Sequence, residues 1–191
     1  MFLGREVALF RRSLLILSGL LLLGLSVPAA DAPPRMAPEF TFHLNSGKEI
    51  RLSSYRGKVV TLLFVSTDCP HCAEVTRFMN TVQKQYEARG YQTLAVAFNP
   101  MAVMLVDEFV KRTSAVFPVG YSDRDVVYNF LQRSPMLRTY VPISVFIDRE
   151  GRIRGQYLGD DPFMGPTDAA RDKNIRNLVE KLLNERAPAG K

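Results

Sequence analysis

Two cysteines three residues apart are the residues of this chain best suited to chemistry. Cys69 and Cys72 enclose Pro70 and His71, and they follow the apolar, β-branched run Val59–Val65, which predicts a buried strand. A helical pattern of apolar residues comes after them. The first thiol is therefore expected at a helix N-terminus, where unpaired backbone N–H groups stabilise a thiolate. Since the thiolate is the nucleophile in disulfide exchange, we predict that Cys69 is the attacking or leaving sulfur and that Cys72 is the resolving thiol.

The residues next to the two thiols influence their chemistry in opposite directions. Pro70 is tolerated at the first helical position, because its missing N–H would have no partner there. A protonated His71 favours the Cys69 anion and makes the pair a better oxidant. Asp68 places a negative charge beside Cys69, which opposes thiolate formation. The direction of electron transfer, oxidase or reductase, is thus left open.

Other uses of two cysteines agree less well with the residues. A structural disulfide across so short a ring adds little chain-entropy stabilisation. Zinc needs further ligands, and the chain has two cysteines and two histidines in all. Covalent haem attachment requires a histidine directly after the second cysteine, where Ala73 stands. We therefore expect no metal or bound cofactor apart from the redox-active disulfide Cys69–Cys72 itself.

The remaining sequence predicts the elements that hold this pair in place. Residues 40–52 alternate around a turn at Asn45–Gly47 and predict a β-hairpin. Strands and helices then alternate, and a final hairpin and helix follow the last buried strand. We expect α/β architecture, with one mixed central sheet, helices on both faces and an N-terminal hairpin extension. The expected elements are a helix from the cysteines to Gly90, strands at 91–98 and 116–121, helices at 102–113 and 125–132, strands at 143–147 and 153–157, and a helix around 175–183.

The first thirty residues are typical of an export signal. Three arginines precede the apolar run 13–27, and small residues follow it. The run is shorter than the roughly 20 apolar residues that a membrane-spanning helix needs, which favours cleavage, with a short uncleaved anchor as the alternative. Residues 31–38 hold three prolines and predict a linker, 39–186 the domain and 187–191 a flexible tail. The domain is then expected outside the cytoplasm, in a periplasm or on the outer face of the cytoplasmic membrane, where disulfides persist.

Composition and charge limit the classes of partner that we expect. With 47% apolar residues the chain is too hydrophobic for a disordered protein. The net charge is +6, but the basic residues are scattered and form no dense run with interleaved aromatic residues. Nucleic acid is therefore not an expected partner. We expect cysteine-containing exported proteins as partners, together with a membrane or periplasmic donor or acceptor of electrons. Contact with the membrane is expected only if the N-terminal segment is retained.

Residues 38–186 resemble the thioredoxin superfamily, and more narrowly its exported or membrane-tethered TlpA/ResA-like and redoxin branch. The resemblance rests on residues 42–58, on the strand that leads into the Cys-Pro-His-Cys motif, and on Val141-Pro142 ahead of the strand that ends in Asp148-Arg-Glu-Gly151. It implies a thioredoxin-like fold, a cis peptide bond at Pro142 beside the two sulfurs, and a backbone at Val141 that helps to hold the substrate chain. It also implies an extracytoplasmic thiol-disulfide oxidoreductase, in cytochrome c maturation or redox homeostasis.

The chain departs from the family pattern around the motif. Family members commonly have tryptophan just before the first cysteine, whereas this chain has none and presents Ser66-Thr67-Asp68. Leu63 stands where thioredoxins have a buried acid that assists proton transfer to the second cysteine. The histidine between the cysteines resembles strongly oxidising DsbA-type motifs, while the surrounding pattern resembles TlpA/ResA-type reductants. The resemblance therefore also leaves the direction open.

Two other functions of the superfamily are alternatives. A peroxiredoxin-like thiol peroxidase is suggested by Ser66-x-x-Cys69, which matches part of the peroxidase pattern, although Leu62 replaces its proline. A Sco-like copper-delivery module, which is not an enzyme, holds copper with two thiolates and a distal histidine. That family spaces its cysteines one residue further apart, and no histidine follows Cys72 here.

Overall fold

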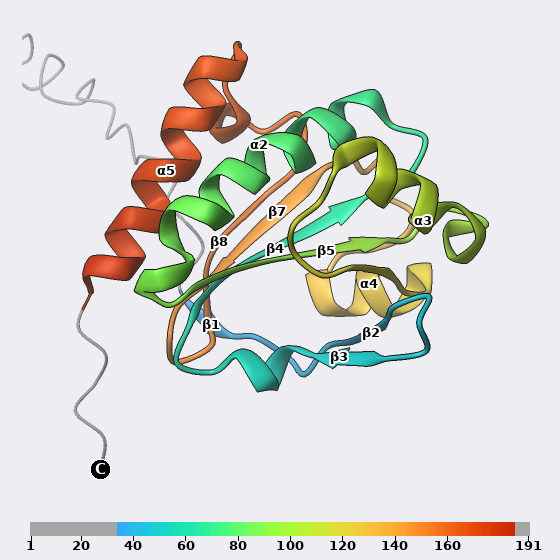
Figure 1. Ribbon diagram of the computed structural model, residues 1–191, viewed down its shortest axis with the longest axis horizontal. Coiled ribbons are helices and arrows are strands. Elements are labelled where there is room, and N and C mark those ends of the chain that lie inside the picture. Colours follow the sequence, from blue (N-terminus) through green and yellow to red (C-terminus); the bar gives the residue numbers. More distant parts are fainter. Residues whose placement is uncertain (1–33, 186–191) are drawn as a thin grey trace, which may run out of the picture. The chain divides into compact units, whose positions relative to one another are not determined.

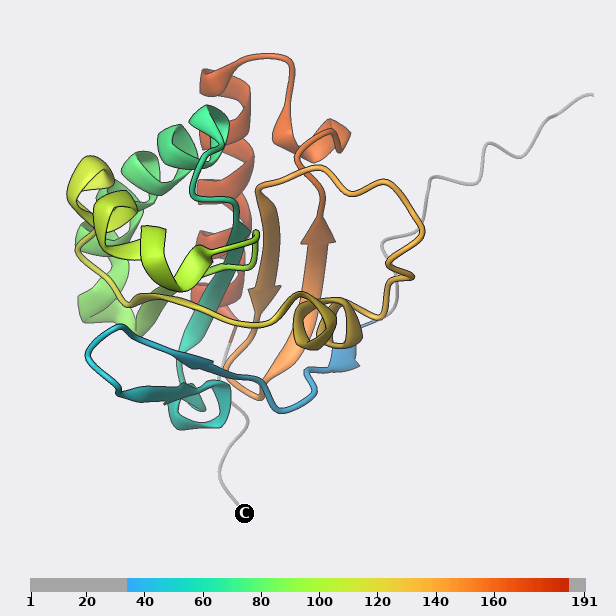
Figure 2. The same ribbon diagram turned by 90° about the vertical axis from the view of Figure 1, so that its right-hand side faces the viewer.

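A computed structural model describes residues 34–185 of the chain. They form an eight-stranded mixed sheet in the order β1-β8-β7-β4-β5-β6-β2-β3, with helices packed on both of its faces (Figures 1 and 2). This confirms the predicted α/β architecture. The predicted export signal, 1–30, and the predicted tail, 187–191, lie outside the described residues.

The elements follow the predicted order closely. The strands are β1 (Arg35–Met36), β2 (Thr41–His43), β3 (Glu49–Arg51), β4 (Val59–Val65), β5 (Tyr91–Ala97), β6 (Val119–Tyr121), β7 (Ile143–Ile147) and β8 (Arg152–Tyr157). The helices are α2 (Pro70–Tyr86), α3 (Ala102–Thr113), α4 (Arg124–Leu131) and α5 (Asp168–Asn184), with 3-10 turns η2 (Leu52–Tyr55), η3 (Glu87–Arg89) and η4 (Pro162–Met164).

Strand β4 is the centre of the sheet and leads into α2. All seven of its residues are buried, as a strand covered on both faces requires. It pairs in parallel with β5 and antiparallel with β7, where Phe64 lies opposite Ile143. The end of β4 and the start of β7 consequently lie at one edge of the sheet. This edge carries both the cysteine motif and Pro142.

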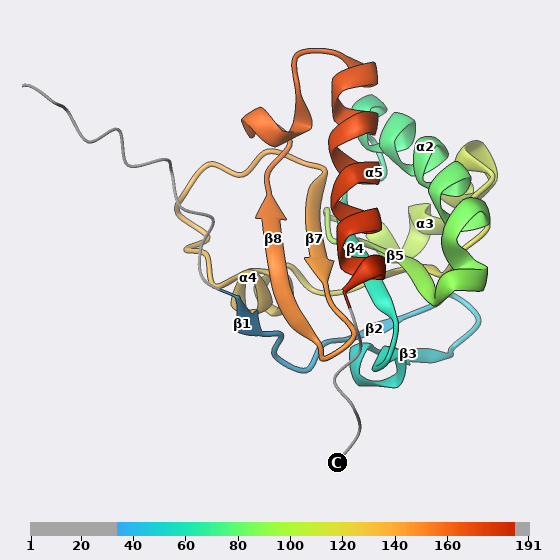
Figure 3. The same ribbon diagram turned by 90° about the vertical axis from the view of Figure 1, so that its left-hand side faces the viewer.

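The two faces of the sheet are covered by different elements. Leu63 and Val65 of β4 belong to a core shared with α2, α3 and α5, whereas Leu62 and Phe64 belong to a core shared with α4 and the β2–β3 hairpin. Figure 3 shows α2, α3 and α5 together over one face of the central strands. The helix that begins at the cysteines thus packs on the sheet beside α3 and α5 (Figure 3).

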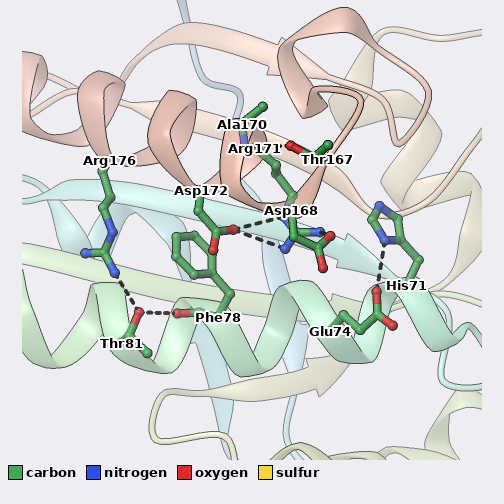
Figure 4. A network of polar contacts seen from close by, with 10 residues as sticks. All are labelled: His71, Glu74, Phe78, Thr81, Thr167, Asp168, Ala170, Arg171, Asp172 and Arg176. Carbon is green, nitrogen blue, oxygen red and sulfur yellow. Dashed lines mark hydrogen bonds and ion pairs between the residues drawn. The ribbon is translucent and has the colours of Figure 1, made fainter.

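A network at the start of α5 ties this helix to α2 (Figure 4). Arg171 is buried and forms ion pairs with Asp168, at 2.8 Å, and with Asp172, at 3.1 Å. Its guanidinium carbon lies 6.0 Å from the centre of the Phe78 ring of α2, and that of Arg176 lies 5.2 Å from the same ring. These contacts hold α2 against α5, its neighbour on the same face of the sheet (Figure 3).

The domain begins earlier than the sequence predicts. Arg35 and Met36, within the predicted linker 31–38, pair with β8 as an edge strand. The Ala37 N–H continues the pairing by donating to the Gly151 carbonyl at 2.9 Å. The prolines of this segment concealed the strand, but proline is compatible with an edge strand, because there its missing N–H breaks no bond of the sheet. The domain boundary therefore lies before Glu39.

Three aromatic rings form the centre of the core under α4. The Phe130 ring lies 5.0 Å from that of Phe40 and 5.6 Å from that of Phe64. We expect Phe130→Ala to lower the free energy of unfolding by about 3–5 kcal/mol, because it leaves a cavity that the sheet cannot fill. Urea denaturation of the two proteins measures the change. Val126→Ala on the same helix, where the side chain is 43% exposed, is the control and should change stability by about 0.5 kcal/mol or less; equal losses would contradict the assignment of this core.

Candidate redox-active site

Cys69 caps the N-terminus of α2. Its backbone is extended, with φ −86° and ψ 116°, and its Sγ accepts the Cys72 N–H at 3.1 Å. Its carbonyl accepts the Ala73 N–H at 3.2 Å, which starts the helical bonding pattern, and Pro70 is the first residue of the helix. The predicted placement of the first thiol at a helix N-terminus is confirmed. Backbone N–H groups directed at Sγ favour the thiolate over the thiol.

The two thiols differ in their surroundings. Cys69 is half-buried and Cys72 is fully buried, and both are free thiols in this structure. Burial raises the pKa of the Cys72 thiol, and the Cys69 sulfur and the Asp68 carboxylate raise it further. A contact with the Ser66 backbone acts in the opposite direction but is outweighed by burial. Cys72 therefore stays protonated under conditions in which an accessible thiol reacts.

His71 has an acidic partner that the sequence analysis did not consider. Its Nδ1 lies 3.5 Å from a Glu74 carboxylate oxygen one helical turn further on (Figure 4). Both side chains are about half exposed, at 41% and 48%, so solvent screens the pair. A protonated His71 thus shares its charge with Glu74. Its predicted effect on the Cys69 anion stays a prediction.

Two residues outside the motif hold the loop before Cys69. The side chain of Asn99, just beyond β5, bonds both the backbone and the hydroxyl of Thr67, and Arg112 of α3 donates to the Thr67 carbonyl. Within the loop, the Ser66 hydroxyl donates to the Asp68 carboxylate. The sequence analysis missed Asn99 and Arg112. The position of Asn99 is the signal that could have found it, because residues at the carboxyl ends of parallel strands gather around sites of this kind.

The Val141–Pro142 peptide bond is cis, as the family resemblance implies. Val141 is half-buried and packs against both hydrophobic cores. Pro142 directly precedes Ile143, which lies opposite Phe64 of β4. The register thus brings the cis peptide bond to the edge of the sheet where β4 leads into the cysteine motif.

Gly159 packs against the backbone of Tyr140 and Val141, a role that was not predicted from the sequence. Its N–H donates to the Tyr140 carbonyl at 2.9 Å. A Cβ at this position would lie 2.6 Å from the carbonyl oxygen of Val141 and 2.8 Å from its carbonyl carbon, closer than side chains approach backbone. Glycine is needed here for close approach of two backbone segments.

A hollow of about 270 Å³ lies beside the motif. It is lined by Asp68, Pro70, Ala73, Glu74, Arg77 and Arg112. Within residues 34–185, no group of three or more histidine, cysteine or acidic side chains is placed to hold a metal ion. Among these residues, the two thiols that a Sco-like copper site would use therefore have no third ligand side chain placed beside them. No helix among the same residues has the length and apolar character needed to cross a membrane.

Comparison with known proteins decides the family. The model of the Redoxin family matches residues 32–172. The chain belongs to the Redoxin family. The thiol-disulfide oxidoreductase ResA of Geobacillus thermodenitrificans is 29% identical over 157 residues, which cover 78% of this chain and 87% of the relative. That of Geobacillus kaustophilus is 32% identical over 118 residues, which cover 62% and 64% of the two chains.

Solved structures agree with this assignment. The crystal structure of a thiol:disulfide interchange protein of the thioredoxin family from Chlorobium tepidum matches with a TM-score of 0.63 and 28% identity, over 81% of this chain and all of that one. This Redoxin-family protein therefore has the predicted thioredoxin-like fold. It is a ResA-like thiol-disulfide oxidoreductase of the thioredoxin superfamily, as its motifs predict.

The unequal burial of the two thiols predicts unequal alkylation. With reduced protein near neutral pH, iodoacetamide should modify Cys69 and leave Cys72 unmodified, because the reactive species is the thiolate and the pKa of Cys72 is raised. Modification of Cys72 should begin only above the ordinary thiol pKa of about 8.5. Tandem mass spectrometry of the peptide that contains both residues assigns the label. Protein unfolded in urea is the control and should react at both positions; equal reaction in the folded protein would disprove the assignment.

Proposed function

We propose that this oxidoreductase acts outside the cytoplasm and exchanges disulfides with cysteines of exported polypeptides through Cys69 and Cys72. The observation that carries the proposal is the unequal environment of the two sulfurs. Cys69 is accessible and accepts a helix N–H at 3.1 Å, while Cys72 is fully buried one turn further on. A nucleophile and a protected resolving thiol require this arrangement.

The exchange proceeds in two steps when the protein acts as a reductant. The Cys69 thiolate attacks a substrate disulfide, a mixed disulfide forms, and the first substrate sulfur leaves as a thiolate that takes up a proton. Cys72 then loses its proton and attacks Cys69 Sγ, which forms the Cys69–Cys72 disulfide and releases the second substrate sulfur. The substrate gains two electrons and the cysteine pair loses them. As an oxidant, the protein runs the same steps in reverse.

The other residues of the site have supporting roles in this proposal. Pro70 starts the helix and so directs the first N–H groups toward Cys69. His71, when protonated, favours the thiolate. Pro142 keeps the preceding peptide at the edge of the sheet, where the backbone of Val141 holds an extended substrate chain by hydrogen bonds.

The cellular setting is proposed from the N-terminal sequence. Residues 1–30 have the order of an export signal or short anchor, which would deliver the domain to an oxidising compartment. There the protein would exchange electrons with a membrane or periplasmic donor or acceptor. We propose cytochrome c maturation or general thiol homeostasis as the process. Neither setting needs a bound cofactor.

The reduction potential of the cysteine pair tests the function and gives its direction. The mature domain is equilibrated with glutathione buffers, and the thiols are quantified. A potential near −120 mV, like that of DsbA, indicates a donor of disulfides, whereas a value of about −270 mV or lower indicates a reductant. A pair that shows no reversible exchange with glutathione would refute the proposal.

Single substitutions of the cysteines should have different effects. Cys69→Ser should abolish exchange with a polypeptide disulfide such as that of insulin, because the nucleophile is lost. Cys72→Ser should stop after the first step and accumulate a mixed disulfide through Cys69, visible by mass spectrometry and reversed by dithiothreitol. Exchange through Cys72 in the Cys69→Ser protein would contradict these roles. Turnover of hydrogen peroxide, measured in parallel, tests the peroxidase alternative.

Gly159→Ala should reduce exchange with polypeptides selectively. The added methyl group displaces the Val141 carbonyl, which in our proposal positions the substrate backbone. We expect the rate constant for a polypeptide disulfide to fall roughly tenfold, because small misplacements of positioning groups have effects of this size. The rate with a small aromatic disulfide should change less than twofold. Gly47→Ala, at a distant turn where φ is +82° and a methyl group meets no atom within 4 Å, is the control for general destabilisation: it should strain that turn and leave both rates unchanged.

A further inference from the structure

Every polar group of Thr67 is bonded by a side chain from another element. Its N–H donates to Asn99 Oδ1 at 2.9 Å, and its hydroxyl accepts from Asn99 Nδ2 at 2.9 Å. Its carbonyl accepts from Arg112 Nη2 at 2.5 Å. Thr67 itself is buried, with 4% of its surface exposed. This residue stands two positions before the nucleophile Cys69, so we name the three side chains Thr67, Asn99 and Arg112 the Thr67 clamp.

The sheet register places Asn99 at this position. Val65, the last residue of β4, pairs with Ala97, the last residue of β5. The Phe98 N–H still donates to the Val65 carbonyl, at 3.3 Å. Thr67 and Asn99 each lie two residues after the last paired residue of their strand. The hydrogen bonds of the Asn99 side chain to Thr67 therefore continue the pairing of the two segments beyond the last backbone bond.

Arg112 comes from the last turn of α3, on the other side of the loop. Its guanidinium carbon lies 5.6 Å from the centre of the Phe109 ring, which fixes the side chain against its own helix. A charge-assisted bond to a carbonyl is stronger than one between neutral groups. The loop before Cys69 is thus held from β5 and from α3 at once.

The position of this loop matters for the thiolate. The stabilisation of Cys69 depends on the 3.1 Å contact between its Sγ and the Cys72 N–H, a contact made in the first turn of α2. Besides that contact, the Cys69 N–H donates to Ser66 at 3.2 Å, so the path of residues 66–68 sets the place of the sulfur. Asp68 is exposed and does not anchor the loop in the core.

The charges around the loop balance one another. Two guanidinium groups, of Arg77 and Arg112, and two carboxylates, of Asp68 and Glu74, line the hollow beside the motif. Their formal charges cancel, and solvent screens them further. Loss of the Arg112 charge would by itself disfavour the thiolate, so the charge-neutral change Asn99→Ala separates loss of the clamp from loss of a local charge.

We propose that Asn99 and Arg112 are positioning residues that set the redox equilibrium of the cysteine pair by clamping Thr67. The inference rests on the proposed redox function of Cys69 and Cys72. Loosening the clamp lets Sγ move away from the helix N-terminus, which destabilises the thiolate and with it the reduced form. The pair then becomes more reducing.

The test compares reduction potentials of clamp variants with that of the unaltered protein. Asn99→Ala and Arg112→Met should each shift the equilibrium constant with glutathione about fivefold toward oxidised protein, which corresponds to about −20 mV for a two-electron couple. Thr67→Ser keeps all three polar groups and should stay within twofold. Lys111→Met removes a cation from the neighbouring position of α3 and is the matched control, also within twofold.

The outcomes separate the two proposals. If the unaltered protein shows no reversible couple, the redox function fails, and the clamp fails with it. If that couple is present but both clamp variants stay within twofold of it, the clamp is overturned while the function stands. Equal shifts in Arg112→Met and Lys111→Met would show a long-range charge effect and would also overturn the clamp. If Asn99→Ala fails to fold, as judged by circular dichroism, the isosteric and charge-neutral Thr67→Val, which removes the hydroxyl that Asn99 bonds, decides the question.

Discussion

The junction between β4 and α2 is the constraint on which the site depends. A strand buried on both faces ends at Val65, and after a three-residue loop Cys69 caps the helix that follows. Its sulfur accepts the Cys72 N–H, so the atom that caps the helix is also the proposed nucleophile. Structure and chemistry are therefore coupled at this position: the N–H that completes the cap is the N–H that stabilises the thiolate.

The second thiol is governed by a different constraint, which is burial. Leu63 on β4 is fully buried and apolar, and it stands where thioredoxins place an acid. The pKa of Cys72 is raised, so the resolving thiol is inert until a mixed disulfide forms beside it. The Asp68 carboxylate, which accepts a hydrogen bond from the Ser66 hydroxyl, adds to this effect, because its negative charge raises the pKa of the Cys72 thiol further.

The sequence predicted the parts of the fold that carry a strong local pattern. Strands β4 and β7 are buried on both faces, and helix α3 has a clear apolar stripe, so their bounds agree with the predicted ones. Strand β1 was missed because two residues between prolines have no periodicity. Asn99 and Arg112 were missed for another reason: they act on Thr67 across 32 and 45 residues, and such contacts arise only from the register of the sheet and the packing of α3. The motif thus identified the reacting atoms, while their support became visible only in three dimensions.

The loop before the motif shows how a departure from the family pattern is compensated. Where relatives commonly place tryptophan, this chain has Ser66-Thr67-Asp68, and small polar residues cannot hold a loop by packing a large ring. Hydrogen bonds take this role instead. The N–H and hydroxyl of Thr67 bond to Asn99, just beyond β5, and its carbonyl bonds to Arg112 of α3, while Asp68 is exposed. Because Thr67 is buried and Asp68 is exposed, the loop can be rigid at its base and still polar at its surface. For the proposed exchange with different polypeptides both properties are useful, since rigidity fixes the sulfur and a polar surface does not select for one apolar partner.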